Sequence, residues 1–127
     1  MNAVVDKLNY IFWIWIGALF TGALIPGMGV GSIEIDSFSF RADYLLHALA
    51  FFGIVAIFAM ARRNEVVIFK RFAWTKLILL CIFLGLTIEV LQHFIPGRTF
   101  NPIDMLFNLV GLTVGLLFFY IPSVCRS

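Results

Sequence analysis

Four long apolar stretches constrain the fold of this 127-residue chain more than any other feature of its sequence. Each contains 18 to 22 residues, close to the ~20 that an α-helix needs to cross a hydrocarbon core about 30 Å thick. None alternates like a membrane β-barrel strand, and a spanning segment must satisfy its own backbone groups. We therefore predict an all-α polytopic membrane protein, a compact four-transmembrane-helix bundle that forms a single domain over residues 1–127. The predicted helices cover about 8–25, 44–61, 73–94 and 103–121.

Composition excludes several other classes of protein. Hydrophobic residues make up 62% of the chain and charged residues 13%, unlike a soluble domain. The net charge of +2, without a basic patch interleaved with aromatics, argues against nucleic acid as a partner. Cys81 and Cys125 form neither a CxxC pair nor a disulfide framework. A signal peptide is the alternative for the first stretch, but the apolar core of this stretch exceeds the usual ~7–15 residues. We therefore interpret it as a membrane helix. Its aromatic residues Tyr10, Trp13 and Trp15 lie near its start, where we expect the membrane interface.

Basic residues predict the orientation of the bundle. The loop between the second and third stretches is rich in them, whereas the other two loops have a single arginine each, near a helix end. The positive-inside rule places that loop in the cytoplasm, together with both termini. The loops at 26–43 and 95–102 then face outward. The basic residues concerned are Arg62, Arg63, Lys70, Arg71 and Lys76, with Lys7 and Arg126 near the termini.

The first outward loop, residues 26–43, opens with glycines at alternate positions. This spacing lacks the Lys-Ser/Thr ending of a phosphate-binding loop, so we interpret it as a flexible turn after a helix. We hypothesise that Ile33, Ile35, Phe38 and Phe40 rest this loop on the membrane surface as a lid.

Polar residues inside the apolar helices mark the candidate site, because ionisable groups are costly in hydrocarbon and rare there. Counted from the outer helix ends, His47, Glu89 and Asn108 all lie roughly 9–10 Å below the outer surface. Each shares a helix face with other polar residues at i+3 or i+4 spacing. We therefore expect polar groups from three helices to meet in one intramembrane site that opens outward. The residues that share these faces are Asp43, Gln92, His93 and Asp104.

Structural roles also fit several of these residues. Asn101 and Pro102 predict a helix start, with the asparagine as cap and the proline at the first helical position. Asp104 in the same turn could satisfy backbone donors, with or without a role in the site. Gly111 and Gly115 have the spacing that permits close packing of helices, and we favour that role over contact with a substrate.

Glu89 and His47 are the strongest candidates for site residues. An ionised group at the centre of a bilayer costs ~2.5–3.5 kcal/mol even on lenient scales. The alternative is that these two residues pair with each other to lock the bundle. Asn108 could likewise act only as a hydrogen-bonding residue between helices.

The surroundings of the predicted site favour an anion. The second and fourth helices present their N-termini outward, and Arg41 and Arg98 add positive charge there. The simplest ligand is the phosphate or carboxylate of a lipid or envelope-precursor headgroup, with Glu89 and His47 deeper as proton acceptor or donor. A metal ion is the alternative, but no HExxH-like spacing is present, and we assign no metal-binding residues. The residues of acceptable ligand type are Asp43, His47, Glu89 and Asp104.

The polar residues fall into short motifs, which are D-Y-L-L-H at 43–47, E-V-L-Q at 89–92, P-G-R at 96–98, and Asp104 with Asn108 and Gly111. In combination they resemble the VanZ-like family of small bacterial membrane proteins, named after an accessory protein of teicoplanin resistance. The resemblance implies a four-helix inner-membrane protein with an outward polar motif and a cell-envelope role, including reduced binding of teicoplanin-like lipoglycopeptides. The family usually has a lysine where this chain has Tyr44. This departure counts against a mechanism that needs an ammonium group there, although Arg41 could partly substitute.

The sequence thus predicts a multi-pass protein of the bacterial inner membrane whose site faces the extracytoplasmic side. We expect it to recognise, and in an enzyme version to process, an anionic lipid or lipid-linked envelope-precursor headgroup. A non-catalytic binding or assembly module is the alternative, followed by a small transporter, and the sequence leaves the cofactor and a homo-oligomer open. The predicted catalytic residues are Glu89, His47, Asp43 and Asp104. The predicted substrate-binding residues are Arg41, Arg98, Gln92 and Asn108.

Overall fold

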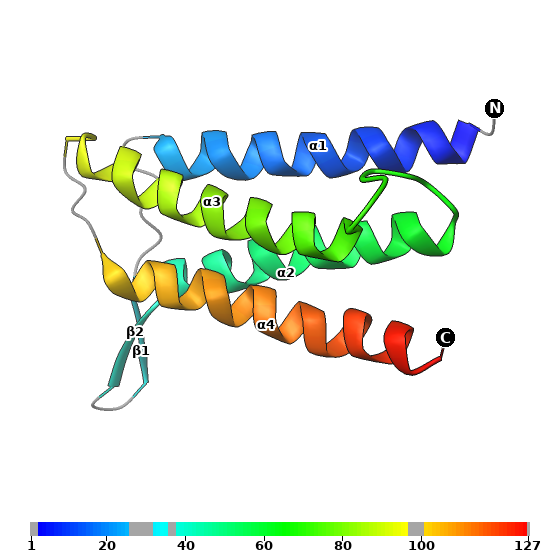
Figure 1. The fold of residues 1–127 in the computed structure, drawn as a ribbon. Coiled ribbons are helices and arrows are strands. Elements are labelled where there is room, and N and C mark those ends of the chain that lie inside the picture. Colours follow the sequence, from blue (N-terminus) through cyan, green and yellow to red (C-terminus); the bar gives the residue numbers. More distant parts are fainter. Residues whose placement is uncertain (1–2, 26–31, 36–37, 97–100, 127) are drawn as a thin grey trace.

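The structure, a computed structural model, is a bundle of four helices with one short β-hairpin (Figure 1). It describes residues 3–25, 32–35, 38–96 and 101–126, and the side chains of all of these except residues 4, 5, 32–35 and 38–41. The predicted all-α bundle of four helices is therefore confirmed. The elements in chain order are α1 (Ala3–Leu24), β1 (Ser32–Ile35), β2 (Phe38–Arg41), α2 (Ala42–Arg63), α3 (Ala73–His93) and α4 (Pro102–Cys125).

All four helices are long and apolar enough to cross a membrane. Large apolar side chains cover the outside of the bundle; those of Phe83 and Phe118, for example, are 69% and 67% exposed. Hydrocarbon solvates such a surface, whereas water does not. The helices α1, α2 and α4 extend past the apolar stretches that predicted them, because backbone hydrogen bonding continues into polar flanks that hydropathy does not count. The chain is a multi-pass membrane protein.

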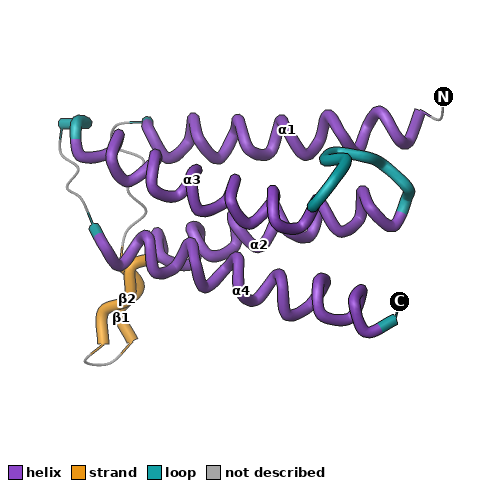
Figure 2. Tube along the Cα trace, in the orientation of Figure 1, coloured by secondary structure: helices purple, strands orange, loops and turns teal. Residues whose placement is uncertain are grey.

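The two ends of the bundle differ in chemistry. Both termini and the α2–α3 loop lie at one end, and the hairpin and the start of α4 lie at the other (Figure 2). The first end carries the exposed basic side chains that predicted a cytoplasmic loop, among them Arg62, Arg71 and Lys76. The polar residues of the candidate site belong to the second end, as expected from their positions along the helices.

The connection between α1 and α2 contains a structure that we did not predict. Residues in β1 and β2 pair antiparallel, with Ser32 opposite Arg41 and Ile35 opposite Phe38. The flexible turn that we predicted concerns the glycines at 27–31, which lie outside the described residues, so it stays a prediction. The sequence I-E-I followed by F-S-F alternates apolar and polar residues with a period of two, which is the strand pattern. The lid hypothesis concerns side chains that lie outside the described part of the structure.

Helices α2 and α4 pack most closely, because α4 has glycine where the helices meet. A Cβ atom built on Gly111 would lie 2.0 Å from the main-chain oxygen of Ala48. A Cβ atom on Gly115 would lie 2.7 Å from the Cβ of Val55. Neither position can hold a side chain without moving the helices apart. The predicted role of these glycines in close packing is confirmed.

The half of the bundle that lies toward the two termini has an apolar core. Phe12 of α1, Phe58 of α2 and Leu77 of α3 are all buried there, and the ring of Phe12 lies 6.0 Å from that of Phe58. Trp15 lies in the middle of the span Asp6–Leu24, where its indole N–H donates to the main-chain oxygen of Ala50 over 3.0 Å. This bond ties α1 to α2, Trp15 is still 40% exposed, and its interfacial position stays a prediction.

The packing at Gly111 predicts a specific loss of stability. Gly111→Ala forces α4 away from the α2 main chain, so we expect the free energy of unfolding to fall by about 1–3 kcal/mol. Thermal unfolding of the purified protein in detergent measures this. Gly17→Ala is the matched control, because a Cβ on Gly17 meets nothing within 4 Å. Equal stability of the two variants would contradict the observed helix packing.

Candidate functional site

The start of α4 anchors one end of the candidate site. Asn101 is the N-cap, its side-chain oxygen accepts a hydrogen bond from the backbone N–H of Ile103 over 3.1 Å, and Pro102 occupies the first helical position. This is the predicted helix start. The backbone N–H of Asn101 itself donates to Oε2 of Glu89 on α3 over 3.4 Å. The cap of one helix is therefore tied to the buried carboxylate of its neighbour.

His47 of α2 lies between two residues of α4. Its Nδ1 is 2.8 Å from Oδ1 of Asn108, and its Nε2 is 4.0 Å from Oδ2 of Asp104. Asp104 and Asn108 are one helical turn apart, so a single imidazole reaches both. In the tautomer with its proton on Nδ1, the ring donates to the amide oxygen of Asn108, and its Nε2 faces the carboxylate of Asp104.

Asp104 links the imidazole to the helix cap. Its second carboxylate oxygen, Oδ1, accepts a hydrogen bond from the side-chain amide of Asn101 over 3.4 Å. The contacts thus run in sequence from Glu89 through Asn101, Asp104 and His47 to Asn108. We call these five residues the polar chain. They come from three helices and follow the inner face of α4 over about 10 Å, the rise of seven helical residues.

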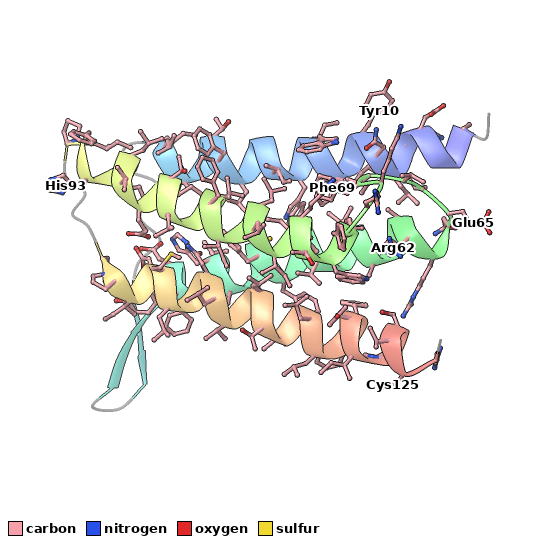
Figure 3. All side chains as sticks on the ribbon, in the orientation of Figure 1. Tyr10, Arg62, Glu65, Phe69, His93 and Cys125 are labelled. Carbon is pink, nitrogen blue, oxygen red and sulfur yellow. The ribbon has the colours of Figure 1, made fainter. Side chains whose placement is uncertain are left out.

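Three residues of the polar chain are buried, and His47 and Asn101 are partly buried. Glu89 and Asn108 are each 1% exposed and Asp104 is 7% exposed. In Figure 3, side-chain oxygen and nitrogen atoms lie between α3 and α4 toward the hairpin end of the bundle. Carboxylates this far from solvent are stable only when donors surround them, because burial strongly disfavours the charged form. Asn101 supplies such donors to both acids, its backbone N–H to Glu89 and its side-chain amide to Asp104, and a charged His47 ring faces Asp104 as well.

The sequence predicted that Glu89 lies at the same depth as Asn108. In the structure the two residues lie at different levels along the bundle. The carboxylate reaches Asn101, whereas the residue of α3 that faces Asn108 is Gly85, where an added Cβ atom would lie 3.5 Å from Nδ2 of Asn108. The prediction measured depth from Pro96, but α3 ends at His93 and residues 94–96 form a turn. Turn residues add little rise along the bundle, so Glu89 lies about one helical turn nearer the hairpin end.

Gln92, which we predicted to bind substrate, makes a contact between helices. Its side-chain amide is 2% exposed and donates to the main-chain oxygen of Ala23 over 2.7 Å. This bond fastens the last turn of α1 to α3. Asp43 lies half-buried in the first turn of α2, one turn before His47. His93 is exposed at the end of α3 (Figure 3).

Of the two arginines that we predicted to bind an anion, the structure describes only the backbone of Arg41. The backbone of Arg41 ends β2, immediately before the first residue of α2, but its side chain lies outside the described part of the structure. Arg98 falls in the segment 97–100, which also lies outside it. In the sequence, Arg41 immediately precedes α2, and Arg98 lies between the end of α3 and the start of α4.

Sequence reasoning missed two residues of the site. Asn101 was predicted as a cap, yet its backbone and side chain also join Glu89 to Asp104. Gly85 was not singled out, although it allows α3 to approach the buried amide of Asn108. A glycine one turn before a buried glutamate on the same helix face is a signal that could have identified it.

The polar chain can exchange protons. A neutral His47 with its proton on Nδ1 offers Nε2 as a proton acceptor, and a charged ring faces the carboxylate of Asp104. Glu89 provides a second acceptor nearer the hairpin end. Within the described residues, no group of three or more His, Cys, Asp or Glu side chains is arranged to hold a metal ion.

Comparison with known proteins identifies the family. The model of the VanZ/LLP1 family matches residues 24–123, which include the whole polar chain and most of the sequence. Searches of curated proteins and of solved structures gave no significant match. The resemblance seen in the sequence motifs is therefore confirmed, and the chain belongs to the VanZ/LLP1 family.

Proposed function

We propose that this protein is a cell-envelope membrane protein whose polar chain recognises the headgroup of an anionic lipid or lipid-linked envelope precursor. The observation that carries the proposal is the buried line of contacts from Glu89 to Asn108 at one end of a membrane-spanning bundle. Such an arrangement is costly in a membrane, and ionisable groups retained there usually serve a function.

In our proposal, different parts of the headgroup bind at different depths, according to the charges around the polar chain. Helices α2 and α4 both begin at the hairpin end, and helix N-termini favour negative charge. Arg41 and Arg98 belong to the connections at that end, where they bind the phosphate or carboxylate in our proposal. The deeper groups, Glu89 and Asp104, are themselves acidic and therefore contact the rest of the headgroup.

A transporter fits this architecture poorly. Below Asn108 the described core is apolar, with Ile54, Leu77 and Phe58 all buried. A path for a polar solute through this bundle needs polar groups at that depth. The polar chain instead reaches only part of the way from one end.

Glu89→Gln separates an enzyme from a binding module. The amide keeps the shape of the side chain but is a poor proton acceptor, so an enzyme that uses Glu89 as a general base should lose about 10²–10⁴-fold of its rate while it still binds lipid. Purified protein is incubated with a lipid extract, and mass spectrometry measures both the altered lipids and those that stay bound. Thr87→Val is the control, since among the described residues the Thr87 hydroxyl donates to the main-chain oxygen of Phe83 in its own helix.

The same experiment also tests recognition alone. Loss of bound lipid in Glu89→Gln, with unchanged thermal unfolding and no altered lipid in either protein, favours the non-catalytic module. A variant that binds and converts lipid as the parent protein does would contradict any role of Glu89 in the site.

We further propose that the polar chain faces the extracytoplasmic side of the bacterial inner membrane. The exposed basic side chains at the terminus end support this orientation through the positive-inside rule. In a Cys125→Ser background, a membrane-impermeant maleimide applied to intact spheroplasts should label His93→Cys and leave Val67→Cys unlabelled until the membrane is opened. Both positions are exposed, at opposite ends of the bundle. Labelling of only the Val67→Cys protein would reverse the proposed orientation.

Membership of the VanZ/LLP1 family also supports a link to glycopeptide resistance. Recognition of envelope headgroups near the outer surface would change how a lipoglycopeptide reaches its target. We expect expression of the chain to lower the teicoplanin susceptibility of a sensitive host, and Glu89→Gln to abolish this effect. Equal susceptibility with and without the chain would contradict the link.

A further inference from the structure

Only one of the two polar atoms in the side-chain amide of Asn108 has a hydrogen-bond partner among the described residues. Its oxygen Oδ1 contacts the ring of His47, whereas its nitrogen Nδ2 is buried and has no hydrogen-bond partner among the described residues. A buried donor without a partner costs about 1–3 kcal/mol, and almost all such donors in proteins are satisfied. The residue is 1% exposed, so bulk water is not the partner.

The free N–H groups of Asn108 face the acidic part of the polar chain. Nδ2 is directed toward α3 at Gly85, because a Cβ atom there would lie 3.5 Å away. Glu89 follows one helical turn later on the same face of α3, and Asp104 lies one turn before Asn108 on α4. A group that binds to Nδ2 is therefore within a turn of two carboxylates.

The hydrogen-bonding capacity of these groups selects the chemistry of a ligand. The group must accept a hydrogen bond from the amide N–H, and beside carboxylates it must also donate one. An ammonium group only donates, so it would leave the amide of Asn108 without a partner. A phosphate oxygen only accepts, and the carboxylates repel it. Of these three kinds of headgroup substituent, the hydroxyl group is the one that does both.

We propose that the headgroup bound by this protein carries a hydroxyl group, which accepts a hydrogen bond from Nδ2 of Asn108 and donates one to Glu89 or Asp104. This inference rests on the proposed function and narrows it, from an anionic headgroup to an anionic headgroup with a hydroxyl group beyond its phosphate. The hydroxyl belongs to a glycerol or to a ring polyol such as a sugar.

Lipids that differ only in the headgroup test this. Purified full-length protein is mixed in detergent with phosphatidylglycerol, phosphatidylinositol, phosphatidylethanol or phosphatidylcholine of the same acyl chains, and native mass spectrometry measures the bound fraction. Phosphatidylethanol has the charge of phosphatidylglycerol but no hydroxyl group. We expect one of the two hydroxylated lipids to bind about fivefold more tightly than phosphatidylethanol, the ratio that one hydrogen bond gives in a membrane. Which of the two binds better distinguishes a glycerol from a ring polyol.

Two variants assign the preference to Asn108. Asn108→Asp keeps an oxygen for His47 and removes the N–H donor, so the preference over phosphatidylethanol should disappear. Gly85→Ala places a methyl group over Nδ2 without changing any charge, and its closest contact, 3.3 Å to the flexible side chain of Met105, can relax. It should also remove the preference, which keeps the test valid if Asn108→Asp does not fold. Thr113→Val is the control on the same helix, because that hydroxyl donates to Leu109 of its own helix.

The outcomes separate this inference from the proposed function. Equal binding of phosphatidylethanol and both hydroxylated lipids, all above phosphatidylcholine, would overturn the hydroxyl inference and leave the proposed function standing. Binding of no anionic lipid above phosphatidylcholine would overturn both. A hydroxyl preference that persists in Asn108→Asp and in Gly85→Ala would show that the hydroxyl binds elsewhere, which also overturns the inference.

Discussion

The close approach of α4 to the main chain of α2 is the constraint on which the candidate site depends. At Gly111 the approach leaves no room for even a methyl group, because the oxygen of Ala48 occupies that space. His47 immediately precedes Ala48 and Asn108 lies three residues before Gly111, so this contact also sets the distance between the imidazole and the amide. Side chains of ordinary size at the helix contact would separate the two groups and leave both unsatisfied in a low-dielectric interior.

With the helices this close, the buried carboxylates of Glu89 and Asp104 need hydrogen-bond donors inside the bundle. The N-terminus of α4 provides one, since the backbone N–H of Asn101 reaches Glu89 and the Asn101 amide reaches Asp104. Asn101 thus has two structural roles. It caps the first turn of α4, and it donates hydrogen bonds to two buried carboxylates. The same contacts hold these acids in place near the hairpin end of the bundle, where, in our proposal, a headgroup meets them without entering the apolar half of the core.

Local patterns in the sequence predicted the elements well, and tertiary contacts less well. The four spans, the cap at Asn101 and the close packing at Gly111 follow from hydrophobicity, capping and residue size, which act over a few residues. The hairpin at 32–41 was missed although its alternation was visible. The depth of Glu89 was misjudged because a turn consumes residues without adding rise. The partner of Gln92 is a main-chain oxygen on another helix, and only the packed structure identifies such a partner.

The contact between His47 and Asn108 is the central claim, and a double-mutant cycle measures it most directly. The free energy of unfolding is compared for His47→Ala, Asn108→Ala and the double variant in detergent or bicelles. A hydrogen bond between these side chains predicts a coupling of about 0.6–1.7 kcal/mol, as found for pairs inside membranes. His47→Ala combined with Thr113→Ala should be additive, because Thr113 bonds only to its own helix in the described structure. Additivity of His47 and Asn108 would contradict the polar chain and the site built on it.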